Sequence, residues 1–295
     1  MNYKKFLMAN RKSSLHLVTL SAVLYSGIAF LSQLPIPVQA QSQSVSQATK
    51  NFLKGSSGVI GFNPPPGEPQ GTASGSPRGS CPQDTNNLTP LTPGTKQGLT
   101  KEKEENVTDY PTLTLSEHPT FFVYVPQTST QEAELIVNEQ TGENKYSDFY
   151  YTKINLPGRP GIVSIKLPAE RSLKTGKLYQ WYFSLICNSN NSAGENSRQT
   201  LPDSSGNPEV LGWVKRIEPD PKLVKALEQQ KTPLKRAALY GEYGIWHELL
   251  TTLAEQRHSQ PEVAAIWENL LKSDTVKLGD ISKAPLLECC TPKIE

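Results

Sequence analysis

The sequence predicts an α+β protein in which an antiparallel β-sandwich is followed by a small C-terminal helical unit. Two changes of pattern along the 295 residues favour this fold class. From about residue 110 to residue 217, short apolar or alternating runs are separated by turn residues, as in antiparallel sheets. After Pro219 the apolar residues recur at helical spacing instead.

Six strands are expected in the first region. The clearest covers residues 178–187, where Trp181 and Cys187 share one face and Tyr182 lies on the other. Trp and Cys on an inward face favour an immunoglobulin-like sandwich, a likeness of fold that carries no function. The other five strands are expected at residues 119–126, 132–138, 145–154, 162–167 and 210–217.

Four helices are expected after Pro219, over residues 221–230, 233–243 and 245–258 and from Pro261 onward. Part of this region resembles a single tetratricopeptide-like unit, because small, aromatic and proline residues stand at the spacing of that repeat. The residues concerned are Ala237, Tyr240, Gly244, Trp246, Leu253 and Pro261. One repeat cannot bury its own apolar face, so we expect it to pack on the sandwich or on the fourth helix.

Residues 1–40 are expected to be a secretory signal peptide. Four basic residues precede the largely apolar stretch Leu15–Leu34, and Val38-Gln39-Ala40 is a small-x-small cleavage site. An uncleaved anchor is the alternative, because about 20 apolar residues also span a bilayer. In both cases the bulk of the chain is periplasmic or extracellular, and no membrane span is expected after signal cleavage.

The rest of the chain divides by composition. Residues 41–105 are rich in Pro, Gly and Ser and are expected to form a disordered linker. The sandwich is expected at 106–218, the helical repeat-like unit at 219–285 and a short tail at 286–295. Without residues 1–40 the chain has 26 basic and 28 acidic groups, which argues against binding of nucleic acid through a basic surface.

An oxidising compartment favours disulfide bonds. The four cysteines, Cys81, Cys187, Cys289 and Cys290, allow three full pairings. Neighbours in sequence rarely bridge, so the preferred pair is Cys81 with Cys187. Pairing of one of these two with Cys289 or Cys290 stays open as the alternative.

No catalytic, metal or cofactor site is expected. The chain lacks a Cys-x-x-Cys sequence and has no His near any Cys in sequence, which argues against a metal site. His118 precedes a proline at a strand start, and His247 and Glu248 are adjacent on a helix and therefore do not face each other. His258 suits the end of its helix electrostatically. Nucleophile, zinc and phosphate-loop motifs are also absent from the sequence.

Five aromatic residues are the candidates for ligand binding. They could form an exposed platform for stacking on sugars, or they could be core and cross-strand pairs, which aromatic residues favour in sheets. The observation that separates these interpretations is whether the helices cover the face of the strand that carries Tyr182. The candidates are Tyr124, Tyr146, Tyr150, Tyr182 and Trp213.

Several longer motifs occur in a fixed order at residues 78–81, 118–126, 161–164, 179–187 and 243–248. Through them, residues 75–285 are similar to the cyanobacterial family catalogued as domain of unknown function 928. The resemblance implies a secreted or periplasmic protein of a photosynthetic bacterium without an established activity. Cys81 and Cys187 are the two cysteines of its motifs, which supports their pairing.

These observations predict an envelope protein of unknown activity that serves as a non-enzymatic binding or assembly module. Its partner would be an envelope protein or a polysaccharide. One alternative is a carbohydrate-binding module that uses the surface aromatics. The other is a hydrolase with a non-local site, in which His118 would take part.

Overall fold

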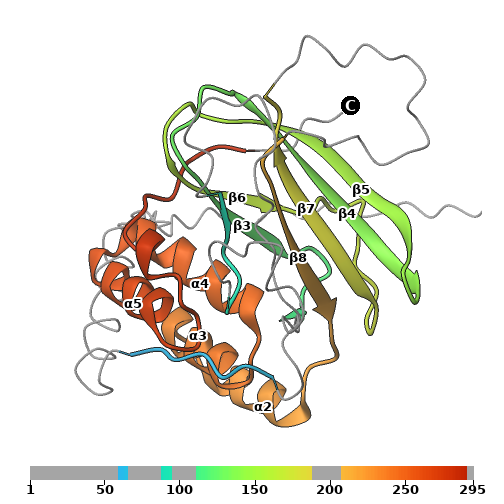
Figure 1. The fold of residues 1–295 in the computed structure, drawn as a ribbon. Helices are drawn as coiled ribbons and strands as arrows, with labels where there is room; N and C mark the ends of the chain where they lie inside the picture. The colour runs from blue at the N-terminus through green and yellow to red at the C-terminus, as the bar shows by residue number, and fades with distance from the viewer. Residues whose placement is uncertain (1–58, 66–87, 95–110, 188–206, 291–295) are drawn as a thin grey trace, which may run out of the picture.

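The structure, a computed structural model, describes residues 59–65, 88–94, 111–187 and 207–290 (Figure 1). Two β-sheets face each other, and four α-helices pack against the outer side of the smaller sheet. The mixed α+β class expected from the sequence is confirmed. Within the described residues, no helix has both the length and the apolar character needed to cross a membrane.

The larger sheet has five strands in the order β2-β8-β7-β4-β5. Their bounds are β2 (Thr112–Thr114), β4 (Glu132–Gly142), β5 (Lys145–Asn155), β7 (Leu178–Leu185) and β8 (Glu209–Arg216). Neighbours run antiparallel except β2 and β8, which are parallel. The purely antiparallel arrangement expected from the sequence is therefore wrong at this edge, where the short strand β2 had not been predicted.

The smaller sheet has three antiparallel strands in the order β1-β3-β6. They are β1 (Thr89–Pro90), β3 (Thr120–Val125) and β6 (Gly161–Lys166). Alternation gives this sheet two buried faces. Phe121 and Val123 point to the larger sheet, whereas Phe122 joins the cluster of apolar side chains beneath the helices. The immunoglobulin-like connectivity stays a prediction.

The core between the sheets is built around Trp181, whose side chain is almost fully buried. Its ring lies 5.3 Å from that of Phe121 on the facing sheet. On β8 it is paired with Gly212, where a Cβ atom would come within 2.6 Å of the indole. Glycine is therefore needed at this position to make room for the largest side chain of the core.

Four helices cover the far side of the three-stranded sheet: α2 (Pro221–Gln229), α3 (Pro233–Glu242), α4 (Trp246–Ser259) and α5 (Pro261–Lys272). A short 3-10 helix, η3 (Gly279–Ile281), follows them. Proline stands in the first turn of α2, α3 and α5, where its missing N–H costs nothing. Trp267 of α5 meets Phe122 of β3 edge to face at 6.4 Å, which ties the helices to the sheet.

The first turn of α4 fastens the helical layer to two other elements. The indole Nε1 of Trp246 donates a hydrogen bond of 2.8 Å to the carbonyl oxygen of Leu91, just after β1. Glu248 Oε1 accepts from the Thr114 hydroxyl at 2.8 Å and from the backbone N–H groups of residues 115 and 116. These bonds hold the short strand β2 in place at the edge of the larger sheet.

Two pieces of the expected linker belong to the fold. In residues 59–65, Ile60 and Phe62 are buried beneath the helices, and the ring of Phe62 lies 4.8 Å from that of Trp246. The N–H of Asn63 donates to the carbonyl oxygen of Gly241 at 2.9 Å. A Cβ atom at Gly241 would come within 2.1 Å of this segment, so the glycine permits the close approach.

Residues 88–94 are the second piece, because they form β1 and bury Leu88 and Leu91. The expectation of a disordered linker is therefore wrong at both segments. Its average composition concealed short apolar stretches that fit the core. The other residues of 41–105 lie outside the described residues, as does the expected signal peptide.

Part of the expected tail also joins the fold. The N–H of Ile162 in β6 donates to the carbonyl oxygen of Pro285 at 2.7 Å, and the N–H of Leu287 donates back to Ile162 at 2.9 Å. Leu287 is buried in the core between the sheets. The chain thus passes from the helical layer back to the sandwich before residue 290.

Candidate functional site

The face of the larger sheet that points away from the sandwich core carries the candidate site, and we call it the outer face. The helices lie beyond the smaller sheet, so they do not cover it (Figure 1). Alternation along the strands places aromatic, amide and carboxyl side chains there together. They are Glu134, Ile136, Asn138, Tyr146, Tyr151, Lys153, Gln180, Tyr182, Ser184, Glu209, Leu211 and Trp213.

An aromatic pair stands at one end of the outer face. Tyr146 of β5 is paired with Gln140 of β4, and Trp213 of β8 is paired with Gln180 of β7. Their ring centroids are nevertheless only 6.1 Å apart, with the planes inclined by 45°. The two side chains therefore reach toward each other over the strands between them. Tyr146 keeps 41% of its surface exposed.

Tyr182 lies in the middle of the outer face and is half-buried. Its hydroxyl donates a hydrogen bond to Gln180 Oε1. Burial, together with the nearby Glu209 carboxylate, raises the pKa of Tyr182 to about 12. The phenol is therefore neutral at physiological pH, and because its O–H is donated to Gln180, its oxygen presents a fixed hydrogen-bond acceptor.

Two carboxyl groups flank Ser184 in one cross-strand row. Glu134 of β4 and Glu209 of β8 are both paired with Ser184 of β7, whose hydroxyl donates to Glu209 Oε2 at 2.9 Å. Burial raises the pKa of both carboxyl groups. At Glu134 the opposing effects come from Tyr151 and Lys153, whereas at Glu209 the Glu134 charge adds to the rise.

Asn138 contributes an unusual buried group to the outer face. Only 3% of its surface is exposed, and its Oδ1 has no hydrogen-bond partner among the residues that the structure describes. The residue is paired with Gln180, which in turn is paired with Trp213. A buried acceptor without a donor is costly, so this position favours the arrival of a donor from outside.

The structure brings together three of the five predicted aromatic residues. Tyr146, Tyr182 and Trp213 share the outer face, and the helices do not bury Tyr182. Tyr124 instead packs against the apolar cluster beneath the helices, and Tyr150 packs against the core between the sheets. The platform interpretation therefore loses these two residues and keeps its central one.

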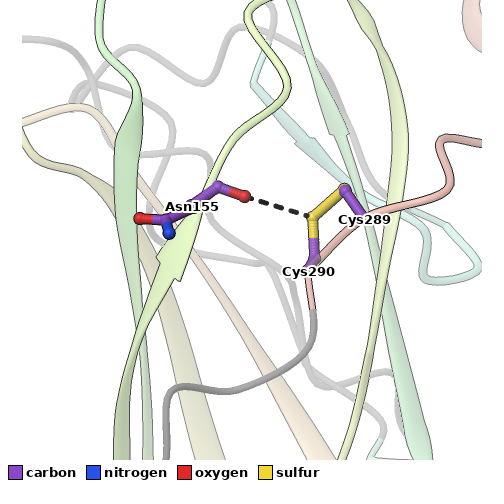
Figure 2. Close-up of a disulfide and its surroundings, with 3 residues drawn as sticks. All are labelled: Asn155, Cys289 and Cys290. Carbon is purple, nitrogen blue, oxygen red and sulfur yellow. Dashed lines mark hydrogen bonds between the residues drawn. A yellow bond between two sulfur atoms is a disulfide. The ribbon is translucent and has the colours of Figure 1, made fainter.

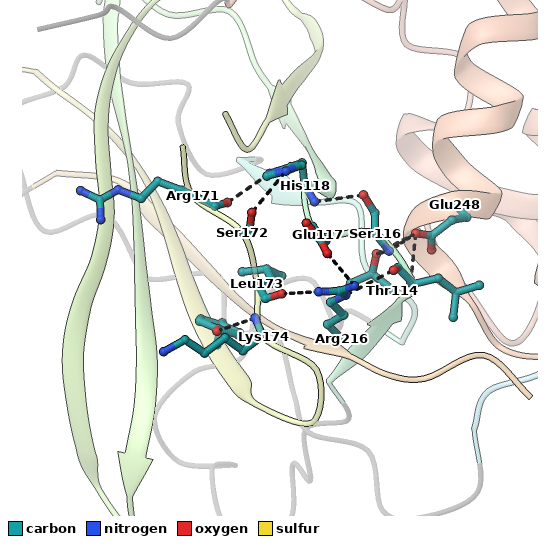
Figure 3. Close-up of polar contacts among 12 residues, drawn as sticks. Thr114, Ser116, Glu117, His118, Arg171, Ser172, Leu173, Lys174, Arg216 and Glu248 are labelled. Atoms are coloured by element: carbon teal, nitrogen blue, oxygen red, sulfur yellow. Dashed lines mark hydrogen bonds and ion pairs between the residues drawn. The ribbon is translucent and has the colours of Figure 1, made fainter. Parts of the chain in front are cut away.

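His118 lies in a polar network that follows the C-terminal end of β2 (Figure 3). Its Nδ1 donates to the carbonyl oxygen of Arg171 at 3.2 Å, and its Nε2 faces the Ser172 hydroxyl at 3.4 Å. The neighbouring Glu117 forms an ion pair of 3.0 Å with Arg216. A carbonyl oxygen thus holds the position where a catalytic triad has a carboxylate. The arrangement accounts for His118 as a residue that joins two loops.

His247 is a structural histidine of the helical layer. Its Nδ1 donates to the carbonyl oxygen of Thr120 at 2.9 Å, and its Nε2 lies 2.8 Å from the Thr112 hydroxyl. Burial lowers the pKa of His247 to about 4, so the ring is neutral. In the parts of the chain that the structure describes, no cluster of His, Cys, Asp or Glu is placed to hold a metal ion. The side chain of His258 lies outside the description.

Cys289 and Cys290 are bonded to each other (Figure 2). Bridging of neighbours in sequence, which was expected to be rare, thus occurs here, and the alternative that joins Cys289 or Cys290 to Cys81 or Cys187 is not what the structure has. Cys290 Sγ lies 3.9 Å from the carbonyl oxygen of Asn155, against the end of β5. Cys187 is also disulfide-bonded. Its pairing with Cys81 stays a prediction, because Cys81 lies outside the described residues.

Sequence reasoning missed Glu134, Asn138 and Glu209 as members of the site. The signal was present for Glu134, because alternation along the expected strand 132–138 places Ala133, Leu135 and Val137 on the opposite face. Asn138 requires more, since only the strand pairing places it beside Gln180 and Trp213. The sequence thus predicted only part of the disulfide pairing, of the contacts of the histidines and of the composition of the outer face.

Comparison with known proteins places the chain in a family but supplies no activity. No curated protein matches it. A family model described as Domain of Unknown Function (DUF928) matches residues 73–286. The matched range includes both sheets and all four helices, and it leaves out segment 59–65 and the last described residues. The family resemblance noted from the sequence motifs is confirmed over nearly the same range. The chain belongs to the DUF928 family.

Proposed function

We propose that this protein is a non-enzymatic module that binds polysaccharide through the outer face of its larger sheet. The observation that carries the proposal is the aromatic pair, Tyr146 and Trp213, on a face that the helices leave uncovered. Aromatic faces provide large, rigid contact areas for the C–H surfaces of sugar rings, and a few polar groups beside them fix the orientation of the ligand. Tyr182 and Gln180 are such polar groups.

The proposal places the protein in the cell envelope, with a polysaccharide or an envelope protein as its partner. The expected signal peptide and the preferred Cys81–Cys187 pair support an oxidising compartment outside the cytoplasm. The motif resemblance to a cyanobacterial family supports a photosynthetic bacterium as the source.

A protein partner is the second candidate, favoured by the helical layer. Ala237 and Tyr240 of α3 are buried in the helical cluster with Trp246 of α4, as their places in a tetratricopeptide-like unit require. Val224 of α2 is 38% exposed and offers an apolar contact. A hydrolase that uses His118 has less support, because no carboxylate among the described residues is bonded to that ring.

Isothermal titration of the full chain against soluble envelope polysaccharides tests the proposal. We expect binding that Tyr146→Ala or Trp213→Ala weakens by about tenfold or more, as truncation of an aromatic residue at the centre of an interface does. Tyr146→Phe keeps the ring and Trp213→Phe keeps an aromatic face, so both should retain most of the affinity.

Val224→Ala is the control on the helical layer and should leave polysaccharide binding unchanged. Unfolding curves establish that each variant is folded. Absence of binding to every polysaccharide, or binding that is unaffected by loss of either ring, would contradict the proposed function.

A further inference from the structure

The outer face continues from the aromatic pair as three cross-strand rows over β4, β7 and β8. The first contains Asn138, Gln180 and Trp213, and the second contains Ile136, Tyr182 and Leu211. The third contains Glu134, Ser184 and Glu209. Successive rows are two residues apart, so the first and third are separated by roughly 13 Å along the strands. This is the length of a di- to trisaccharide.

Each row offers a different chemistry to a chain that lies along the strands. The first row has the Trp213 ring and the acceptor Asn138 Oδ1, for which the described residues supply no hydrogen-bond donor. The second has the half-buried Tyr182, with its ring beside apolar Leu211. The third has two carboxyl groups, which accept hydrogen bonds when ionised and oppose any additional negative charge.

We propose that the outer face holds a linear, uncharged glycan that runs along β4 and β7 across all three rows. A hydroxyl or acetamido N–H of the glycan donates to Asn138 Oδ1 beside the aromatic pair, where the glycan displaces the side chains that bury this amide in the free protein. The carboxyl groups of Glu134 and Glu209 accept from hydroxyl groups at the other end and reject acidic glycans. The inference rests on the proposed function and adds the class, the length and the direction of the ligand.

The third row, with its two carboxyl groups, is the part of the outer face that should exclude anionic glycans. Burial already raises the pKa of Glu134 and Glu209, which shows that negative charge is unfavourable in this place. A uronate placed beside them would add a third negative charge in the same partly desolvated row. Lys153 is the register partner of Glu134 across β4 and β5, and its charge offsets part of the rise in the pKa of Glu134.

A length and charge series tests the inference. The full chain is titrated at neutral pH with N-acetylglucosamine oligomers of increasing length and with galacturonate oligomers of the same lengths. For the neutral series we expect affinity to rise by about tenfold from the monosaccharide to the trisaccharide and then to level off, because the contact area stops growing. The galacturonate series should bind at least about tenfold more weakly than the neutral one at equal length.

Three variants connect these results to the rows. Asn138→Leu removes the acceptor and should weaken neutral trisaccharides by about fivefold or more, whereas Val224→Ala on the helical layer is the control and should leave their affinity unchanged. Glu209→Gln keeps an acceptor for the Ser184 hydroxyl but removes a charge, so galacturonate oligomers should gain affinity. Glu209→Gln is close in shape to the original residue, which keeps this arm informative if Asn138→Leu does not fold.

Different binding results would overturn the proposed function and the inference about the ligand. Absence of binding to any glycan would overturn the proposed function and this inference with it. Binding that depends on Tyr146 and Trp213 but not on chain length, or that is equal for neutral and acidic oligomers, would overturn only the inference. Unchanged galacturonate affinity in Glu209→Gln would also overturn it.

Discussion

Acid should destabilise this fold through one buried ring, that of His247. The ring has 5% of its surface exposed and is held by the Thr120 carbonyl oxygen and the Thr112 hydroxyl. Its pKa is lowered to about 4 in the folded state, against 6.5 for an ordinary histidine. The unfolded chain therefore binds a proton more readily, and the stabilisation present above pH 6.5 is lost as the pH falls toward 4. From these two pKa values the loss between pH 8 and pH 5 is about 2 kcal/mol, rising to about 3 kcal/mol at pH 4.

Urea unfolding followed by tryptophan fluorescence at pH 8, 6 and 5 measures this loss, because Trp181, Trp246 and Trp267 are all buried. Other groups titrate in the same range, and the raised carboxyl pKa values of Glu134, Glu209 and Glu248 act in the opposite direction. The decisive quantity is therefore the difference between the wild type and His247→Asn.

His247→Asn retains an N–H donor near the position of Nδ1 but cannot take up a proton. We expect it to be less stable at pH 8 and to lose about 2 kcal/mol less than the wild type between pH 8 and pH 5. His118→Asn, at the histidine that joins two loops, is the matched control for removal of a ring. Equal acid losses in the wild type and His247→Asn would refute the reasoning.

Three further outcomes follow from the packing. Phe62→Ala should lower the free energy of unfolding by about 3–5 kcal/mol in urea titrations, because it empties a site beneath the helices; a loss below 1 kcal/mol would mean that segment 59–65 is not docked. Gly241→Ala should expose that segment to limited proteolysis, since the added methyl group would meet its backbone; an unchanged cleavage pattern would contradict the close approach. Non-reducing peptide mapping should link Cys81 to Cys187, and Cys187→Ser should cost about 4–5 kcal/mol if the loop-entropy account of a disulfide that closes about 100 residues holds. A mapped link between Cys187 and Cys289 would contradict it.

Local pattern predicted the regular elements well. Alternation placed a strand at 178–187, and β7 covers Leu178–Leu185. Helical spacing and prolines placed the first three helices within one residue of their observed ends and placed the start of the fourth at Pro261, because caps and periodicity are properties of neighbouring residues. The tight turn between β4 and β5 lies at Glu143 and Asn144, with Asn144 at φ 53°.

The elements that were missed depend on distant partners. Ile60 and Phe62 are surrounded in sequence by Gly and Pro, and only the helices reveal them as core residues. Strand β2 has only three residues and pairs in parallel with β8, so the local sequence pattern does not predict it. In the same way, the contact of Tyr146 with Trp213 depends on strand order and on the register shift near Val137, neither of which alternation alone specifies.

The docking of segment 59–65 has a consequence for the order in which the chain can fold. Asn63 makes its side-chain bond to Glu242, a residue 179 positions further along the chain. The helical layer cannot be completed until nearly all of the polypeptide has been synthesised. The reason is that segment 59–65 packs against α3 and α4, which are synthesised near the end of the chain. Contacts of such long range slow folding. A late-closing chain of this kind remains open while it emerges from the ribosome, which is the state in which export through a narrow translocation channel, as the expected signal peptide implies, would require it.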